Sequence, residues 1–100
     1  MRGEALSLGV LGDAYHGLGR YEDAVEAFSR ALPIFRDHFI RRHHGLCLFK
    51  LGCAQQALGN HRQAAQHLTE SVSVFRDLRL PTYEQRALRI LNDCRLAAQG

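Results

Sequence analysis

The chain is poor in the residues that characterise several protein classes. It has 3 cysteines and 2 prolines in 100 residues, and Lys50 is the only lysine among its 13 basic side chains. A small, odd number of cysteines speaks against a disulfide framework and fits a reducing, cytoplasmic compartment. The scarcity of proline, together with the lack of serine-rich or glutamine-rich tracts, argues against a long disordered segment.

Long apolar runs and dense charge clusters are also missing. No apolar run approaches the roughly 18 residues that a membrane-spanning helix needs, and the beginning of the chain, with Arg2 and Glu4, does not resemble a signal peptide. The net charge of +3 is spread over both halves of the sequence. Because nucleic-acid-binding domains usually concentrate lysine and arginine in a stripe, neither nucleic acid nor a membrane is an expected partner.

The sequence does contain an internal repeat, because it matches itself when it is shifted by 40 residues. Eight apolar or small residues of the first copy coincide with identical residues of the second: Leu6, Leu8, Leu11, Gly12, Ala14, Leu18, Gly19 and Ala24 fall on Leu46, Leu48, Leu51, Gly52, Ala54, Leu58, Gly59 and Ala64. A third, weaker copy follows. The chain is therefore divided into a first repeat at about 1–40, a second at about 41–80, and a partial repeat or capping helix at 81–100.

Within each repeat, apolar residues recur every three or four positions, which is the period of an amphipathic helix. The segments Gly17–Gly19 and Ala57–Asn60 interrupt this period and predict tight turns. Each repeat is thus expected to form two antiparallel helices, with short links at His38–Ile40 and Leu78–Leu80.

The ends and the regularity of these helices give two finer predictions. Thr82 and Gln85 have the spacing of a capping box, with Pro81 close by, and predict the start of a fifth helix. Pro33 falls inside the second helix, where it lacks a donor and crowds the carbonyl of Ser29, so a kink is expected there but not at Ser73 of the next repeat.

The repeated residues resemble those of the tetratricopeptide repeat family. Its pattern is a large residue, Leu-Gly and an aromatic in the first helix, and then Ala, an aromatic and Ala in the second. The first copy carries it at Leu8, Leu11, Gly12, Tyr15, Ala24, Phe28 and Ala31, and the second copy carries it in part, at Leu48, Leu51, Gly52, Ala64 and Leu68. Gln55 replaces the aromatic in the second copy. The resemblance implies an all-α fold, a right-handed α-α superhelix of about five antiparallel helices in two and a half repeats.

The resemblance also implies a function: a non-catalytic scaffold that binds a protein or peptide in the concave groove of the superhelix. The groove is lined by the first helix of each pair, to which Leu6, Gly9 and Leu46 also belong. Carried over to this sequence, the partner-binding candidates are Asp13, His16, Phe49, Cys53, Gln56, Arg86, Arg89 and Asp93.

Phe49 is the sharpest of these candidates, because its counterpart in the first repeat is Gly9. A lone exposed aromatic beside a cleft suits the capture of a peptide. The chaperone-binding members of the family clamp a carboxylate with Lys and Asn, but Gly9 and Asp13 occupy those positions here, so that activity is not expected.

Candidates for metal binding and catalysis are weak. The densest His and Cys clusters, His43-His44-x2-Cys47 and His61-x5-His67, lack the paired spacing of a zinc site. No nucleophile elbow, phosphate loop or dinucleotide fingerprint occurs. The sequence therefore predicts no enzyme, no metal and no cofactor.

Two alternatives remain open for the last helix and its apolar residues. It either caps the array through Leu88 and Leu91, leaving Ile90 and Leu96 partly exposed, or pairs with another copy of the chain as an oligomerisation module. The exposed arginines are expected either to be solvated or to meet an acidic partner. The 40-residue repeat and the arginine-rich composition favour a segment cut from a longer bacterial protein, a cytoplasmic signalling or transcriptional regulator.

Overall fold

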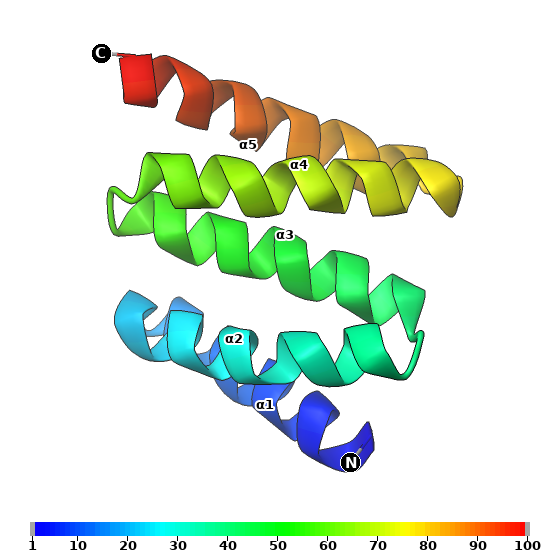
Figure 1. Ribbon diagram of the computed structural model, residues 1–100. Coiled ribbons are helices and arrows are strands. Elements are labelled where there is room, and N and C mark those ends of the chain that lie inside the picture. The colour runs from blue at the N-terminus through cyan, green and yellow to red at the C-terminus, as the bar shows by residue number, and fades with distance from the viewer. Residues whose placement is uncertain (1, 100) are drawn as a thin grey trace.

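Five helices follow one another along the chain in the computed structural model, which describes residues 2–99 (Figure 1). Their bounds are α1 at Arg2–Gly17, α2 at Tyr21–Asp37, α3 at Arg41–Ala57, α4 at His61–Asp77 and α5 at Pro81–Gln99. Residues 2–99 contain no strand. The predicted all-α fold of five antiparallel helices is confirmed.

The turn inside each helix pair depends on glycine. Gly19 and Gly59 have φ angles of 76° and 82°, in the left-handed region that side chains disfavour. This conformation allows the N–H of the next residue, Arg20 or Asn60, to donate to a carbonyl of the preceding helix, at 2.8 and 2.9 Å. Both helix stops predicted from the sequence are therefore present, and their cause is the glycine backbone.

The links between helix pairs, residues 38–40 and 78–80, also have the predicted positions, but they make the same turn without glycine. Phe39 and Arg79 have φ angles of 56° and 57°. A hydrogen bond of 2.9 Å from the N–H of Ile40 to the carbonyl of Phe35 closes the first link. A left-handed phenylalanine carries a conformational cost, which the packing of the helices on either side must offset.

The prediction of a capping box at Thr82 was wrong. Helix α5 begins at Pro81, so Thr82 lies inside the first turn, and the carbonyl of Leu80 accepts the first helical hydrogen bond from Glu84 at 3.0 Å. Proline suits the first helical position because the N–H that it lacks would have no partner there. Helix α2, by contrast, continues through the interior Pro33 to Asp37.

The two helices of each pair cross closely at the glycine that follows leucine in each repeat, Gly12 and Gly52. A Cβ atom added to Gly12 would lie 2.6 Å from Cε1 of Phe28, and one added to Gly52 would lie 2.7 Å from Cγ of Leu68. Any larger residue would push the helices apart. Gly12 and Gly52 therefore mark the close crossing of the two helices in each pair.

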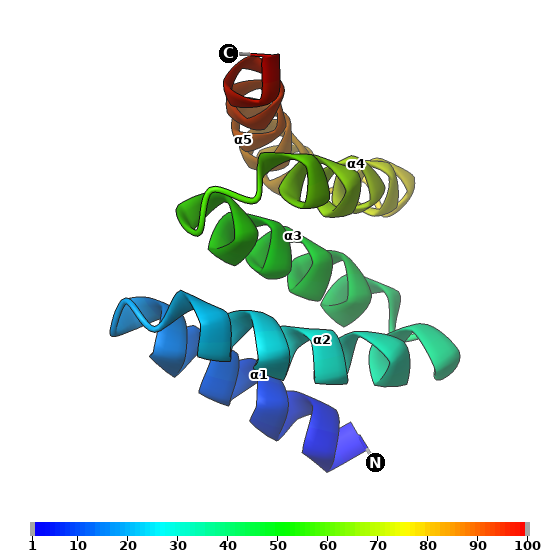
Figure 2. The same ribbon diagram turned by 60° about the vertical axis from the view of Figure 1, so that its left-hand side comes forward.

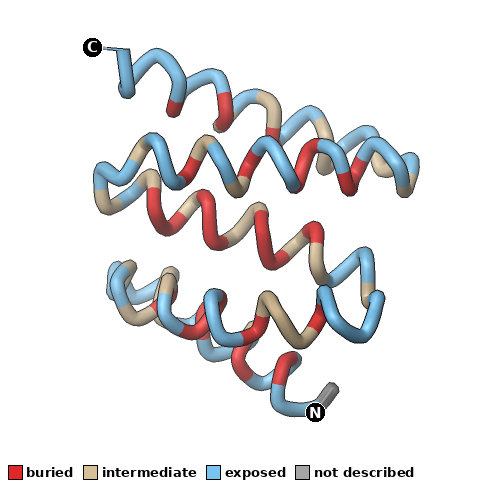
Figure 3. The backbone as a smooth tube through the Cα atoms, in the orientation of Figure 1, coloured by how far each residue is buried: buried red, intermediate tan, exposed pale blue. Residues whose placement is uncertain are grey.

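The helices form two layers that bend the molecule. Helix α3 contacts both α1 and α5, whereas α2 and α4 make no contact with each other in residues 2–99. Helix α3 therefore has α1 and α5 as neighbours on one side of the stack, which the family resemblance predicts to be the concave side, and α2 and α4 lie on the outer side. Figure 2 shows the stack from α1 at the bottom to α5 at the top. Buried residues recur along α3 from Gly45 to Gln55, because this helix lies between α2 and α4 (Figure 3).

Candidate binding groove

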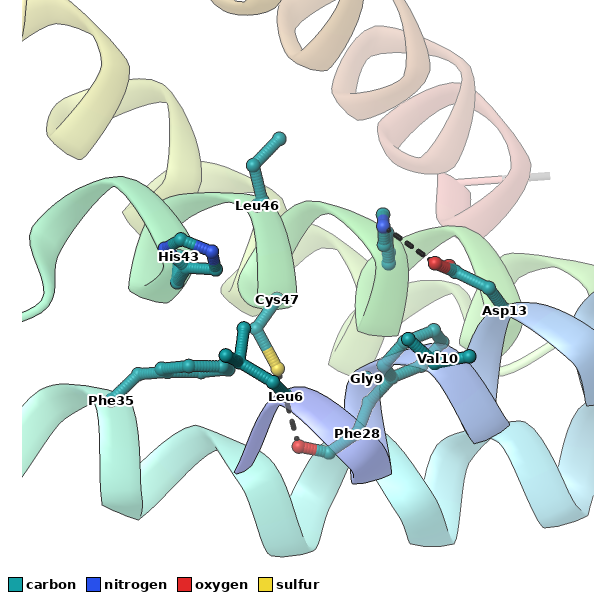
Figure 4. A pocket seen from close by; sticks show the side chains of 10 residues that line it. Leu6, Gly9, Val10, Asp13, Phe28, Phe35, His43, Leu46 and Cys47 are labelled. Atoms are coloured by element: carbon teal, nitrogen blue, oxygen red, sulfur yellow. Dashed lines mark hydrogen bonds and ion pairs between the residues drawn. The ribbon is translucent and has the colours of Figure 1, made fainter. Parts of the chain in front are cut away.

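The concave side contains a pocket between α1, α2 and α3. It has a volume of about 130 Å³. Its lining comes from three helices: Leu6, Gly9, Val10 and Asp13 from α1, Phe28 and Phe35 from α2, and His43, Leu46, Cys47 and Lys50 from α3 (Figure 4). Most of this lining is apolar, so the pocket suits a nonpolar group.

The two repeats differ at several positions of this pocket, and the difference between Gly9 and Phe49 decides whether an aromatic ring of the chain itself lies there. In the second repeat, the ring of Phe49 packs edge-on against Phe75 with centroids 6.3 Å apart, and Phe75 stacks on Tyr83 at 5.3 Å. In the first repeat, the matching pair of Phe35 and His43 is kept at 5.2 Å.

The third ring has no equivalent in the first repeat, because Gly9 stands where the second repeat has Phe49. A Cβ atom added to Gly9 would meet nothing within 4 Å. The first repeat therefore keeps open the space that the second repeat fills with its own side chain.

This arrangement corrects the expectation for Phe49. It was expected to be an exposed aromatic, but it is half-buried and packs on Phe75, against the apolar core that α4 and α5 form. The useful signal in the sequence was the glycine at its counterpart, Gly9. Sequence reasoning placed Gly9 in the groove but did not identify the pocket, and it missed Val10, His43 and Lys50.

An ion pair lies at one end of the pocket. The ammonium of Lys50 contacts Oδ2 of Asp13 at 2.9 Å, and both side chains are partly exposed (Figure 4). An exposed pair of this kind contributes at most about 1 kcal/mol to stability. It can therefore open at little cost to meet charged groups of a partner.

The three candidates on α5 carry charge towards solvent. Arg86, Arg89 and Asp93 are exposed, and none of them makes an ion pair within the part of the chain that the structure describes. Arg86 is the counterpart of Leu46, which lines the pocket, and so occupies the same register one repeat further along the concave layer.

The remaining candidates lie outside the pocket lining. His16 is half-buried, with its ring edge-on to Tyr21 at 5.1 Å near the turn between α1 and α2. Gln56 and Cys53 are half-buried on α3. Burial, and to a smaller extent the nearby Cys94, raises the pKa of Cys53 to about 11.

The cysteines lack the properties of nucleophiles. The thiol of Cys47 donates to the carbonyl of Phe28 at 3.3 Å, and its burial raises its pKa to about 12. Burial also raises the pKa of Cys94. A reactive cysteine needs a lowered pKa, so these protonated thiols act as small apolar groups in the core.

The basic cluster at the start of α3 is divided among different contacts. Arg41 pairs with Asp77 at 3.3 Å, and His43 lies against the ring of Phe35. Burial lowers the pKa of His44, although the carboxylate of Glu70 acts in the opposite direction. The cluster is therefore not a uniform phosphate-binding patch.

Residues 2–99 contain neither a cluster of metal ligands nor a membrane-spanning helix. No group of three or more His, Cys, Asp or Glu side chains in this range could hold a metal ion. None of the five helices is both long and apolar enough to cross a bilayer.

Comparison with known proteins adds a family assignment to this geometry. A family model described as tetratricopeptide repeat matches residues 3–77, which covers four helices and therefore both complete helix pairs. No curated protein is significantly similar to the chain.

Proposed function

The chain belongs to the tetratricopeptide repeat family, and from this we propose that it binds a protein partner along its concave face. Members of this family are typically non-catalytic modules that bind other proteins. The observation that carries the proposal is the apolar pocket of about 130 Å³ on that face. A concave apolar pocket with a few polar groups at its rim is the usual form of a recognition site.

The charges of α5, one repeat further along the concave layer than the pocket, indicate which segment would bind. Arg86 and Arg89 are exposed on α5, and the bidentate guanidinium group pairs well with carboxylates. Asp13, His16, Cys53, Gln56 and Asp93 complete the proposed contact surface, while Phe49 supports it from below by packing on Phe75. The favoured partner is therefore a segment that combines apolar side chains with acidic ones.

The proposal extends to the setting of the module. Its repeats would span about 1–40 and 41–80, with a partial repeat or capping helix from residue 81 onward. The arginine-rich, lysine-poor composition supports a bacterial origin, with the module acting as a scaffold in a cytoplasmic regulatory protein. No catalytic role is included, because the buried thiols stay protonated near neutral pH.

Selection from a random peptide library against the purified protein tests this proposal. The affinity of the selected peptides should fall at least about tenfold with Arg89→Glu, since reversing one charge at a contact costs more than about 1.4 kcal/mol. Arg62→Glu on the outer helix α4 is the matched control and should leave the affinity unchanged. Equal effects of both substitutions, or no selected peptide at all, would contradict the proposal.

A second candidate function is self-association through α5. Leu91 and Cys94 are buried against α4, but Leu96 on the same helix is 68% exposed. A second copy could cover this residue. Light scattering should then show a mass that rises with concentration in the wild type and stays monomeric in Leu96→Gln. A monomeric wild type at millimolar concentration would remove this candidate.

A further inference from the structure

We propose that the pocket beside Gly9 is a specificity pocket that takes one aromatic side chain of the bound partner. The inference rests on the proposed function, since it names what the concave face would recognise. It goes further because it assigns a chemical class of side chain, a phenyl ring or a similar aromatic ring, to one defined place.

The second repeat supplies the evidence for what fits. There, three rings form a continuous cluster in which Phe49 packs on Phe75 and Phe75 packs on Tyr83. The first repeat keeps two members of this cluster, since Phe35 and His43 have nearly the same ring geometry, with interplanar angles of 30° and 28° in the two repeats. A partner's ring would complete the cluster from outside.

The size and the lining of the pocket agree with this occupant. Its volume of about 130 Å³ is close to that of apolar protein cavities, roughly 150 Å³, that bind benzene. Leu6, Leu46 and the ring of Phe35 offer apolar surface, and Phe35 is the counterpart of Phe75, which makes an edge-to-face contact with Phe49.

Access to the pocket is open on the concave side. Gly9 has no side chain to close it, and Val10 at its mouth is 69% exposed (Figure 4). The pair of Asp13 and Lys50 lies at one end and can exchange partners with the backbone or the charges of the incoming segment. An aromatic residue flanked by acidic residues therefore matches both the pocket and the arginines of α5.

The direct test uses N-acetyl-phenylalaninamide as the probe and methyl NMR as the readout. Saturable shifts are expected at Leu6, Val10 and Leu46, which line the pocket. They should vanish in Gly9→Phe, in which the protein's own ring fills the space, and in Gly9→Leu as a second filled variant. Gly3→Phe adds a ring at a glycine of α1 outside the pocket lining and should keep the shifts.

A complementary variant should create a second pocket. Removing the ring in Phe49→Ala opens the matching space of the second repeat, so the same probe should then also shift the methyl groups of Ile90, the counterpart of Lys50. The inference is overturned if the wild type shows no saturable shifts at the three pocket residues, if Gly9→Phe keeps them, or if N-acetyl-leucinamide binds as tightly as the phenylalanine probe.

The peptide library separates this inference from the proposed function. If peptides bind but replacing their aromatic residue by alanine changes their affinity less than about threefold, the pocket assignment fails and the function stands. If the probe binds but no peptide is selected, the function fails and the pocket stands. Phe39 is 85% exposed and could supply a ring from a second copy. Concentration-dependent shifts that Phe39→Ala abolishes would therefore contradict a separate partner.

Discussion

At the scale of single residues, three glycines of α1 and α3 have opposite roles despite lying at related positions. Gly12 and Gly52 are needed because a side chain at either position would clash with Phe28 or Leu68, whereas Gly9 lies beside open space. The sequence pattern predicts the first role, since the repeat keeps Gly12 and Gly52 in register. The open space beside Gly9 could not be predicted from the sequence, because it is the packing of Phe49 in the folded second repeat that shows what a side chain at position 9 would do.

Gly12→Ala and Gly9→Ala should therefore change stability in opposite directions. The new Cβ at position 12 would lie 2.6 Å from the Phe28 ring, and we expect a net loss of about 1–2 kcal/mol after the gain in helix propensity. At position 9 the propensity gain is unopposed and should add about 1 kcal/mol. Urea unfolding followed by circular dichroism measures both, and equal effects would contradict the close crossing.

Adding a ring at position 9 and removing the ring at position 49 should also have opposite effects on stability. Gly9→Phe should stabilise the fold by about 1–2 kcal/mol through added apolar burial and helix propensity. Phe49→Ala should cost about 2 kcal/mol, since a half-buried phenylalanine loses less than a fully buried one. Thermal unfolding of the two variants provides the measurement. A Gly9→Phe variant that melts below the wild type would show that the space cannot hold a ring.

The buried thiol of Cys47 predicts a loss of stability in alkali. Its pKa is raised from 9.0 to about 12 on folding, so above pH 9.0 the unfolded state releases the proton first. Stability from this group is complete below pH 9.0 and decreases as the pH rises. Between about pH 8 and about pH 10 the wild type should lose about 1 kcal/mol more than Cys47→Ala in urea unfolding. Equal losses would contradict burial of an un-ionised thiol.

At the scale of helices, the period of the sequence predicts all five elements and both kinds of turn, because spacing and glycine report directly on backbone geometry. The sequence contains two signals for the start of α5. The helix begins at Pro81, which suits the first helical position, and not after a capping box at Thr82. The left-handed Phe39 was not predictable, since its cost is met by tertiary packing that local sequence does not show.

Helix α2 should become more stable when its interior proline is removed. Pro33 cannot donate to the carbonyl of Ser29, and Ser73 stands at the same place in α4. Pro33→Ser should raise the free energy of unfolding by about 1–3 kcal/mol, since an interior proline costs a helix about 3 kcal/mol in isolation. Differential scanning calorimetry tests this, with Ser73→Ala as the control of little effect. An unchanged melting temperature would mean that α2 accommodates proline without strain.

At the scale of the whole molecule, the arrangement of the helices creates the candidate site. Contacts along α1, α3 and α5, without any between α2 and α4 in residues 2–99, bend the stack so that the pocket opens on the concave side. The sequence and its family resemblance assign α1, α3 and α5 to this face. They do not identify the pocket, because its shape depends on residues of three helices, including Phe35 and His43, that no linear spacing brings together.

The proposal that a partner binds on the concave face can be tested directly. The most direct measurement is a map of amide NMR shifts on adding a peptide selected from the library. Shifts are expected in α1, α3 and α5, centred on Leu6, Leu46 and Arg86. Shifts confined to the outer faces of α2 and α4, for example at Glu26 and Gln66, would contradict it.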